Sequence, residues 1–127
     1  MTGKATPKDP APLVLLVEDD AALGSALQFA LTIEGWRVDV RESGEALLAA
    51  PVPAGRVCLV IDVQLPGISG LAALAEIRRR GEHTPAILIT SDPSPTMSRQ
   101  AAGLGAVIVQ KPLISSELLD AIRDHLA

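Results

Sequence analysis

Residues 59–70 read Leu-Val-Ile-Asp-Val-Gln-Leu-Pro-Gly-Ile-Ser-Gly, and the rest of the chain is organised around this stretch. An apolar run from Val57 to Ile61 leads directly to one carboxylate, Asp62, and then into a Pro-Gly turn. Short apolar runs bounded by turn signals are typical of strands buried on both faces, as in parallel sheets. We therefore expect Asp62 at the carboxyl end of a central strand, where open α/β sheets bind their ligands. A solvated Asp that caps a turn is the simpler interpretation of this stretch taken alone.

The same pattern continues on both sides of this stretch. Five strand-like segments are found, at residues 13–17, 36–40, 57–61, 85–90 and 106–110. Four of them are apolar runs, whereas residues 36–40 alternate apolar and polar side chains, which suggests a strand nearer the sheet edge. Apolar spacing, capping residues and helix breakers predict a helix after each segment, at residues 21–34, 43–50, 71–80, 95–104 and 114–126. Five strands that alternate with five helices predict an α/β fold, with a parallel sheet covered by helices on both faces.

Length and composition exclude several classes of protein. The chain has 127 residues, of which 48% are hydrophobic, which suits one domain with a substantial core. We expect residues 1–12, which are polar and rich in proline, to form a disordered tail ahead of a domain at 13–127. The net charge is −4, and the basic triplet 78–80 ends a predicted helix, which argues against nucleic-acid binding. The single cysteine, Cys58, allows no internal disulfide, and no apolar stretch is long enough to span a membrane, so we expect a cytoplasmic protein.

Four of the expected strands run directly into chemically active side chains. Glu18 and Asp19 follow the first strand, Asp62 ends the third, Thr90 ends the fourth, and Lys111 follows the fifth. In a doubly wound sheet these strand ends lie on one rim, so the side chains can converge. Three carboxylates brought together without a cation raise one another's pKa, and a hard divalent ion such as Mg²⁺ relieves the repulsion. A Lys and a Thr hydroxyl beside such an ion suit the oxygens of a phosphoryl group.

With these motifs the chain resembles the receiver domains of two-component response regulators. The resemblance covers about residues 13–126, and its motifs are residues 15–20, 61–70, 88–90, 105–106 and 111–112. It implies a flavodoxin-like, doubly wound five-stranded parallel sheet in the order 2-1-3-4-5, with five helices. It also implies a cis peptide bond between Lys111 and Pro112, because X–Pro bonds adopt cis at little cost.

The resemblance also implies roles for the residues on the rim. Asp62 would be the phosphoacceptor. Mg²⁺ would be bound directly by Asp19, Asp62 and the backbone carbonyl of Gln64, and by Glu18 mainly through water. Asp20 lies outside the family's acidic pair.

Thr90 would donate to a phosphoryl oxygen, and Lys111 would pair with another. The phosphoryl group would come from a histidine kinase or a phosphotransfer protein. The chain would then act as a signalling switch on a downstream output domain or effector protein, not as an enzyme. It would contact neither nucleic acid nor membrane itself.

Three departures from the family pattern bear on these expectations. Ile108 stands where the family usually has an aromatic residue on the fifth strand. The segment from Thr90 to Lys111 is about one residue shorter than usual, with prolines at 93 and 95. Ile114 replaces a common capping Asp, so Ser115 or Ser116 could cap the last helix instead.

Two other functions remain open from the sequence. Ile108 would suit a module of the same fold that binds partners without phosphorylation. A phosphohydrolase with an Asp nucleophile commonly has a second Asp two residues later as general acid, and here that position is Gln64. The chain could be a stand-alone receiver or one domain of a longer regulator.

Overall fold

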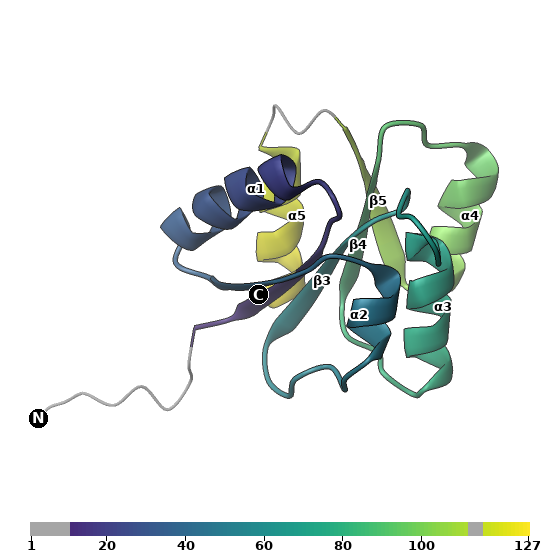
Figure 1. The fold of residues 1–127 in the computed structure, drawn as a ribbon, viewed down its shortest axis with the longest axis horizontal. Helices are drawn as coiled ribbons and strands as arrows, with labels where there is room; N and C mark the ends of the chain where they lie inside the picture. Colours follow the sequence, from purple (N-terminus) through teal and green to yellow (C-terminus); the bar gives the residue numbers. More distant parts are fainter. Residues whose placement is uncertain (1–10, 112–115) are drawn as a thin grey trace, which may run out of the picture.

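The computed structural model describes residues 11–111 and 116–127, and Figure 1 shows it as a ribbon. Its five strands are β1 (Leu13–Val17), β2 (Arg37–Arg41), β3 (Val57–Asp62), β4 (Ala86–Thr90) and β5 (Ala106–Gln110). Its five helices are α1 (Ala21–Ile33), α2 (Gly44–Leu48), α3 (Gly70–Arg79), α4 (Pro95–Gly103) and α5 (Glu117–Leu126). The strands form one parallel sheet in the order β2-β1-β3-β4-β5, which confirms the predicted topology.

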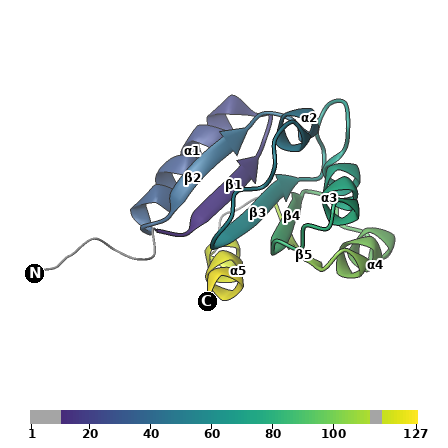
Figure 2. The same cartoon turned by 90° about the horizontal axis from the view of Figure 1, so that it is seen from below.

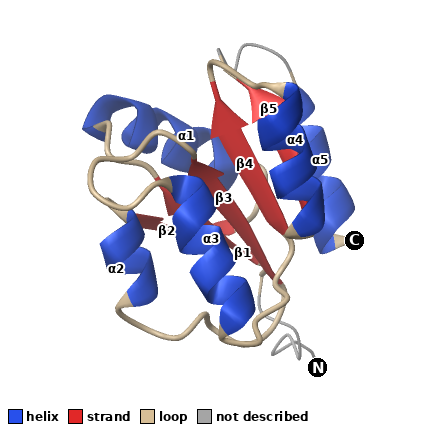
Figure 3. Cartoon of the chain, turned by 90° about the vertical axis from the view of Figure 1, so that its right-hand side faces the viewer, coloured by secondary structure: helices blue, strands red, loops and turns tan. Residues whose placement is uncertain are grey.

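The sheet is covered on both faces. Helices α2, α3 and α4 lie on one face, and α1 and α5 lie on the other (Figures 1 and 3). Along β3, Leu59 and Ile61 pack with the first group of helices, whereas Cys58 and Val60 pack with the second. Because successive side chains of a strand point to opposite faces, burial on both faces explains why the run is apolar without a break.

Capping side chains set the starts of four helices. Asp20 accepts hydrogen bonds from the N–H groups of Ala22 and Leu23 at the start of α1, which gives this acid a structural role. Three serines cap α2, α3 and α4 through the third N–H that follows each, namely Ser43, Ser69 and Ser94. Pro95 takes the first position of α4, where the missing N–H costs nothing.

Some boundaries differ from the predicted ones. Strand β2 begins at Arg37 instead of Trp36, and α2 ends at Leu48 instead of residue 50. Ser116 does not cap α5 with its side chain, because its hydroxyl instead donates to Asp120 Oδ2 at 3.2 Å. Most of the predicted tail (1–10), Ser115 and the Lys111–Pro112 peptide bond fall outside the described residues.

Cys58 lies at the centre of the sheet. It is fully buried in β3, and burial raises the pKa of its thiol to about 12. The predicted role of a small buried hydrophobic residue is therefore confirmed.

In the described part of the chain, none of the helices combines the length and the apolar character needed to cross a membrane.

Candidate functional site

Parallel strands bring the predicted rim residues to the same edge of the sheet. The arrowheads of β2, β1 and β3 point to one edge in Figure 2. Val17 of β1 pairs with Ile61 of β3, so Glu18 and Asp62 follow at the same level. Asp62 in turn pairs with Ile89 of β4, the residue before Thr90. The acids thus meet because adjacent strands end in register.

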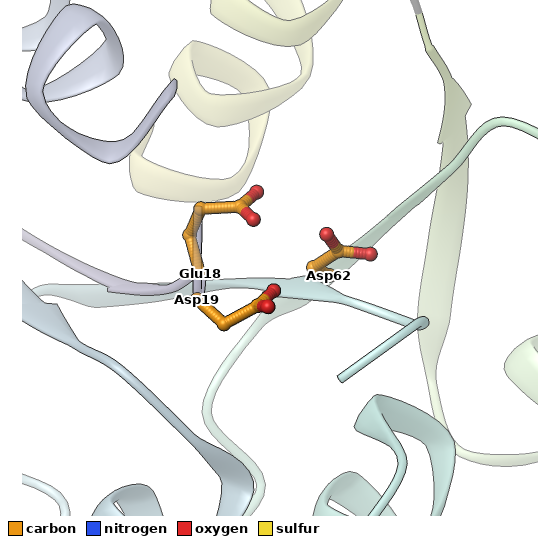
Figure 4. Close-up of side chains that lie close together, drawn as sticks. All are labelled: Glu18, Asp19 and Asp62. Atoms are coloured by element: carbon orange, nitrogen blue, oxygen red, sulfur yellow. The ribbon is translucent and has the colours of Figure 1, made fainter. Parts of the chain in front are cut away.

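Three carboxylates cluster at this edge. Glu18, Asp19 and Asp62 each place an oxygen within 4.8 Å of the others. Figure 4 shows the two acids that follow β1 and the acid that ends β3 directed toward a shared space. Glu18 and Asp62 are only 2% and 3% exposed, whereas Asp19 is exposed. A pair of buried acids with an open third one gives an ion access to the site.

Lys111 partly neutralises the buried acids. Its Nζ lies 2.8 Å from Asp62 Oδ2 and 3.6 Å from Glu18 Oε1. Partial burial would lower the pKa of Lys111, but the hydrogen bond and charge of Asp62, together with Glu18, outweigh burial and raise it. Lys111 therefore pairs with the two buried carboxylates of the three.

Glu18 is the least satisfied group in the site. Its Oε2 accepts a hydrogen bond from the N–H of Asp20 at 3.2 Å, but its buried Oε1 has no hydrogen-bond partner among the described residues. Burial, with a smaller effect of the charge of Asp62, raises the pKa of Glu18 to about 7, against the opposing effects of that hydrogen bond and of Lys111. An unsatisfied buried oxygen beside two more carboxylates suits a hard divalent cation with oxygen ligands.

Thr90 and Gln64 lie at the same edge of the sheet as the acid cluster. Thr90 is fully buried at the end of β4, and its Oγ1 accepts a hydrogen bond from the N–H of Asp92 at 3.2 Å. The N–H of Lys111 donates to the Thr90 carbonyl oxygen at 2.8 Å, which ties β4 to the residue after β5. Gln64 is exposed, and its N–H donates to Asp62 Oδ1 at 2.9 Å. The structure thus brings every predicted site residue to one rim.

Two features next to Asp62 were not predicted from the sequence. A Cβ atom on Gly70 would lie 2.2 Å from the Asp62 carbonyl oxygen, so only glycine lets α3 begin this close to the acid. Glu45, on α2, contacts the loop that follows Asp62. Glycine is a poor helix former, and its presence directly after the Ser69 cap was the available signal for the first feature.

A cavity of about 210 Å³ opens beside the acids. The residues that line it include Glu18, Asp19, Ser25, Gln28 and Glu42. Solvent therefore reaches the acid cluster from the side of α1.

Comparison with known proteins agrees with this geometry. A family model described as the response regulator receiver domain matches residues 14–123. The transcriptional regulatory protein FixJ of Azorhizobium caulinodans is 37% identical over 114 residues, which cover 89% of this chain and 54% of that protein. Nodulation protein W of Bradyrhizobium diazoefficiens is 37% identical over 111 residues, which cover 87% of this chain and 49% of that protein. The chain thus spans about half the length of these curated relatives.

Solved structures share the fold. The crystal structure of FixJ-N has a TM-score of 0.80 at 29% identity, covering 90% of this chain and 92% of that one. TrrA of Thermotoga maritima, solved in complex with Mg(2+)-BeF, has a TM-score of 0.78 at 27% identity. The match covers 91% of this chain and 99% of that one. The chemotaxis protein CheY4 of Vibrio cholerae, with a TM-score of 0.81, 23% identity and coverage of 91% and 99%, shows the fold alone.

Proposed function

Because this chain belongs to the response regulator receiver domain family, we propose that Asp62 is its phosphoacceptor and that phosphorylation of Asp62 switches its output. The observation that carries this proposal is the setting of the Asp62 carboxylate. It is buried at a strand end, accepts a hydrogen bond from Lys111 Nζ at 2.8 Å, and lies beside two further acids. A nucleophile held by a cation at an open rim is suited to attack on phosphorus.

The transfer exchanges one bond at phosphorus for another. A carboxylate oxygen of Asp62 attacks the phosphorus of a phosphohistidine on the partner protein, and a P–O bond forms as the P–N bond breaks. The electron pair of the broken bond stays with the imidazole nitrogen. Lys111 would then pair with a phosphoryl oxygen, and the Thr90 hydroxyl would donate to another. Such transfer depends chiefly on positioning and charge neutralisation.

The acid cluster would hold Mg²⁺. We assign direct ligation to Asp19, Asp62 and the backbone carbonyl of Gln64, with Glu18 acting mainly through water. Glu18 Oε1, which has no hydrogen-bond partner among the described residues, and the three converging carboxylates support this assignment. When bound, Mg²⁺ would offset the negative charge of the phosphoryl oxygens and the acids.

The proposal extends to partners and cellular context. The donor would be a histidine kinase or a phosphotransfer protein, and the receiver, residues 13–127, would act on an output domain or an effector protein in the cytoplasm. Two similar proteins are a transcriptional regulatory protein and a nodulation protein, which fits a role in signalling. We propose a switch, without turnover of an external substrate and without direct contact with nucleic acid or membrane.

One observation favours a second function. Ile108 is half-buried and packs against the core on the face covered by α2, α3 and α4, where it offers no aromatic ring to a partner. A binding module that does not depend on phosphorylation would need no such ring. The complete set of acids, Thr90 and Lys111 favours the phosphorylated switch.

Intact-mass measurement after incubation with acetyl phosphate and Mg²⁺ tests the two functions. A phosphorylatable receiver gains one acid- and base-labile group of about 80 Da, the mass of a phosphoryl group. We expect Asp62→Asn, and wild-type protein in excess EDTA, to gain none. Wild-type protein that stays unmodified would favour the binding module. A variant Asp62→Asn that is labelled at the wild-type rate would place the acceptor elsewhere.

A further inference from the structure

The loop that follows Asp62 is fastened at its tip to helix α2. Glu45, in the first turn of α2, accepts a hydrogen bond from the N–H of Ile68 through its Oε2 at 3.0 Å. The two residues are 23 positions apart, and their elements pack side by side (Figure 1). This contact joins α2 to the connection between β3 and α3.

Two glycines make room for this contact. Gly67 has a φ of +74°, and a Cβ there would also lie 2.4 Å from Glu45 Oε2. A Cβ on Gly44 would lie 2.4 Å from Ile68 Cγ2. A side chain at Gly67 would displace the Glu45 carboxylate, and one at Gly44 would press on Ile68. The Glu45 carboxylate can lie against the Gly67–Ile68 peptide because α2 has a glycine at position 44 and the loop has a glycine at position 67.

The other parts of the loop are tied to the end of β3. The N–H groups of Leu65 and Gly70 both donate to the Val63 carbonyl oxygen, at 3.3 Å and 2.9 Å. The N–H of Gln64 donates to Asp62 Oδ1 at 2.9 Å. Gln64 thus lies on a short closed loop whose base is fixed by β3 and whose tip is fixed by Glu45.

We propose that Glu45 is a positioning residue for the divalent-cation site. By holding the Ile68 N–H, its carboxylate fixes the tip of the loop and with it the direction of the Gln64 carbonyl. The inference rests on the proposed function, because that carbonyl is a proposed Mg²⁺ ligand. Groups that orient metal ligands affect metal affinity without touching the ion.

The charge of Glu45 has two other effects, which the experiment must separate from the positioning of the Gln64 carbonyl. Its charge favours the amino end of α2, and it adds to the negative potential that attracts a cation. The substitution Glu45→Gln removes the charge but keeps a side-chain oxygen of similar reach. Glu45→Ala removes both the charge and the hydrogen bond.

Titration calorimetry with Mg²⁺ measures the affinity directly, whether or not Asp62 is phosphorylated. We expect Glu45→Ala to weaken Mg²⁺ binding roughly three- to tenfold, as for the loss of one exposed charged hydrogen bond, and Glu45→Gln to restore most of it. The matched control is Glu82→Ala, which removes the same charge before β4, at the opposite end of the sheet. It should bind Mg²⁺ like the wild type.

Amide hydrogen exchange gives a second measurement that needs no metal. The Ile68 amide should exchange faster in Glu45→Ala than in the wild type or in Glu45→Gln, with the strand amides unchanged. Equal Mg²⁺ affinity in Glu45→Ala and the wild type would overturn the inference. Equal weakening in both Glu45 variants would also overturn it, because charge alone would explain the loss. Wild-type protein that binds Mg²⁺ but takes no phosphoryl group would refute only the proposed function.

Discussion

At the scale of single residues, Glu18 makes the stability of the metal-free protein depend on pH. Its pKa is raised from 4.5 to about 7, chiefly by burial, so the folded state holds a proton that the unfolded state releases. The stabilisation of the folded state by this proton is fully present below pH 4.5 and is lost as the pH rises through 7. We expect the free energy of unfolding in EDTA to be higher at pH 5 than at pH 8, by on the order of 2 kcal/mol.

Urea denaturation at several pH values between 5 and 8 measures this effect. The control is Glu18→Gln, which cannot titrate and should show a flatter profile over the same range. Added Mg²⁺ should stabilise the wild type more at pH 8 than at pH 5, because the ion competes with the proton for this carboxylate. A wild-type stability profile that runs parallel to the variant's between pH 5 and pH 8 would contradict the assignment.

At the scale of elements, α4 is anchored at one end and less constrained at the other. Arg78 of α3 donates from Nε to the Leu104 carbonyl oxygen at 2.7 Å and from Nη1 to that of Glu82 at 2.9 Å. A planar guanidinium can serve both carbonyls at once, which holds the carboxyl end of α4 against α3. The amino end of α4 is capped by Ser94, which accepts a hydrogen bond from the N–H of Met97 in the same helix. This end follows the exposed residues Ser91 and Asp92.

This asymmetry predicts where phosphorylation changes the structure. Ile108 is β-branched and packs against the core beside α4, so it should keep one rotamer in both states. A ligand shifts a conformational equilibrium only through its different affinity for the two states, and here that difference must come from Thr90 and residues 91–104. Crystal structures with and without beryllofluoride should show the larger displacement in residues 91–104, decreasing toward Leu104. An altered Ile108 rotamer with residues 91–104 unmoved would contradict this prediction.

The strands and helices were the features that could best be predicted from the sequence. Apolar runs located β1, β3 and β4 because these strands are buried on both faces, and the ends of the strands located Asp62, Thr90 and Lys111. The contact of Glu45 with Ile68 could not be predicted, since it joins residues 23 positions apart through side-chain reach. The burial of Glu18 next to an exposed Asp19 likewise depends on packing, which a pair of adjacent acids does not reveal. Roles in phosphorylation and Mg²⁺ binding stay predictions.

At the scale of the whole molecule, the two ends of the sheet are separate environments. Trp36 lies just before β2, at the amino end, and packs against the core shared with α1 and α5. The acid cluster lies at the carboxyl ends of the strands. We expect Trp36 fluorescence to stay within experimental error when Mg²⁺ or beryllofluoride is added, with EDTA as the control. Strong quenching of Trp36 fluorescence would contradict this prediction, because it would show that ligand binding at the acid cluster alters the structure at the opposite end of the sheet.

The burial of Cys58 has a practical consequence. A fully buried thiol whose pKa is about 12 is almost wholly un-ionised and out of reach of alkylating reagents, so it reacts only when the sheet opens. Because the chain has one cysteine, each opened molecule gains one reagent mass. Labelling at neutral pH should therefore count openings of the central strand, without any engineered probe. Under native conditions it should be orders of magnitude slower than in 6 M urea. Rapid labelling of the native protein would mean that β3, the strand that ends in Asp62, opens without denaturant.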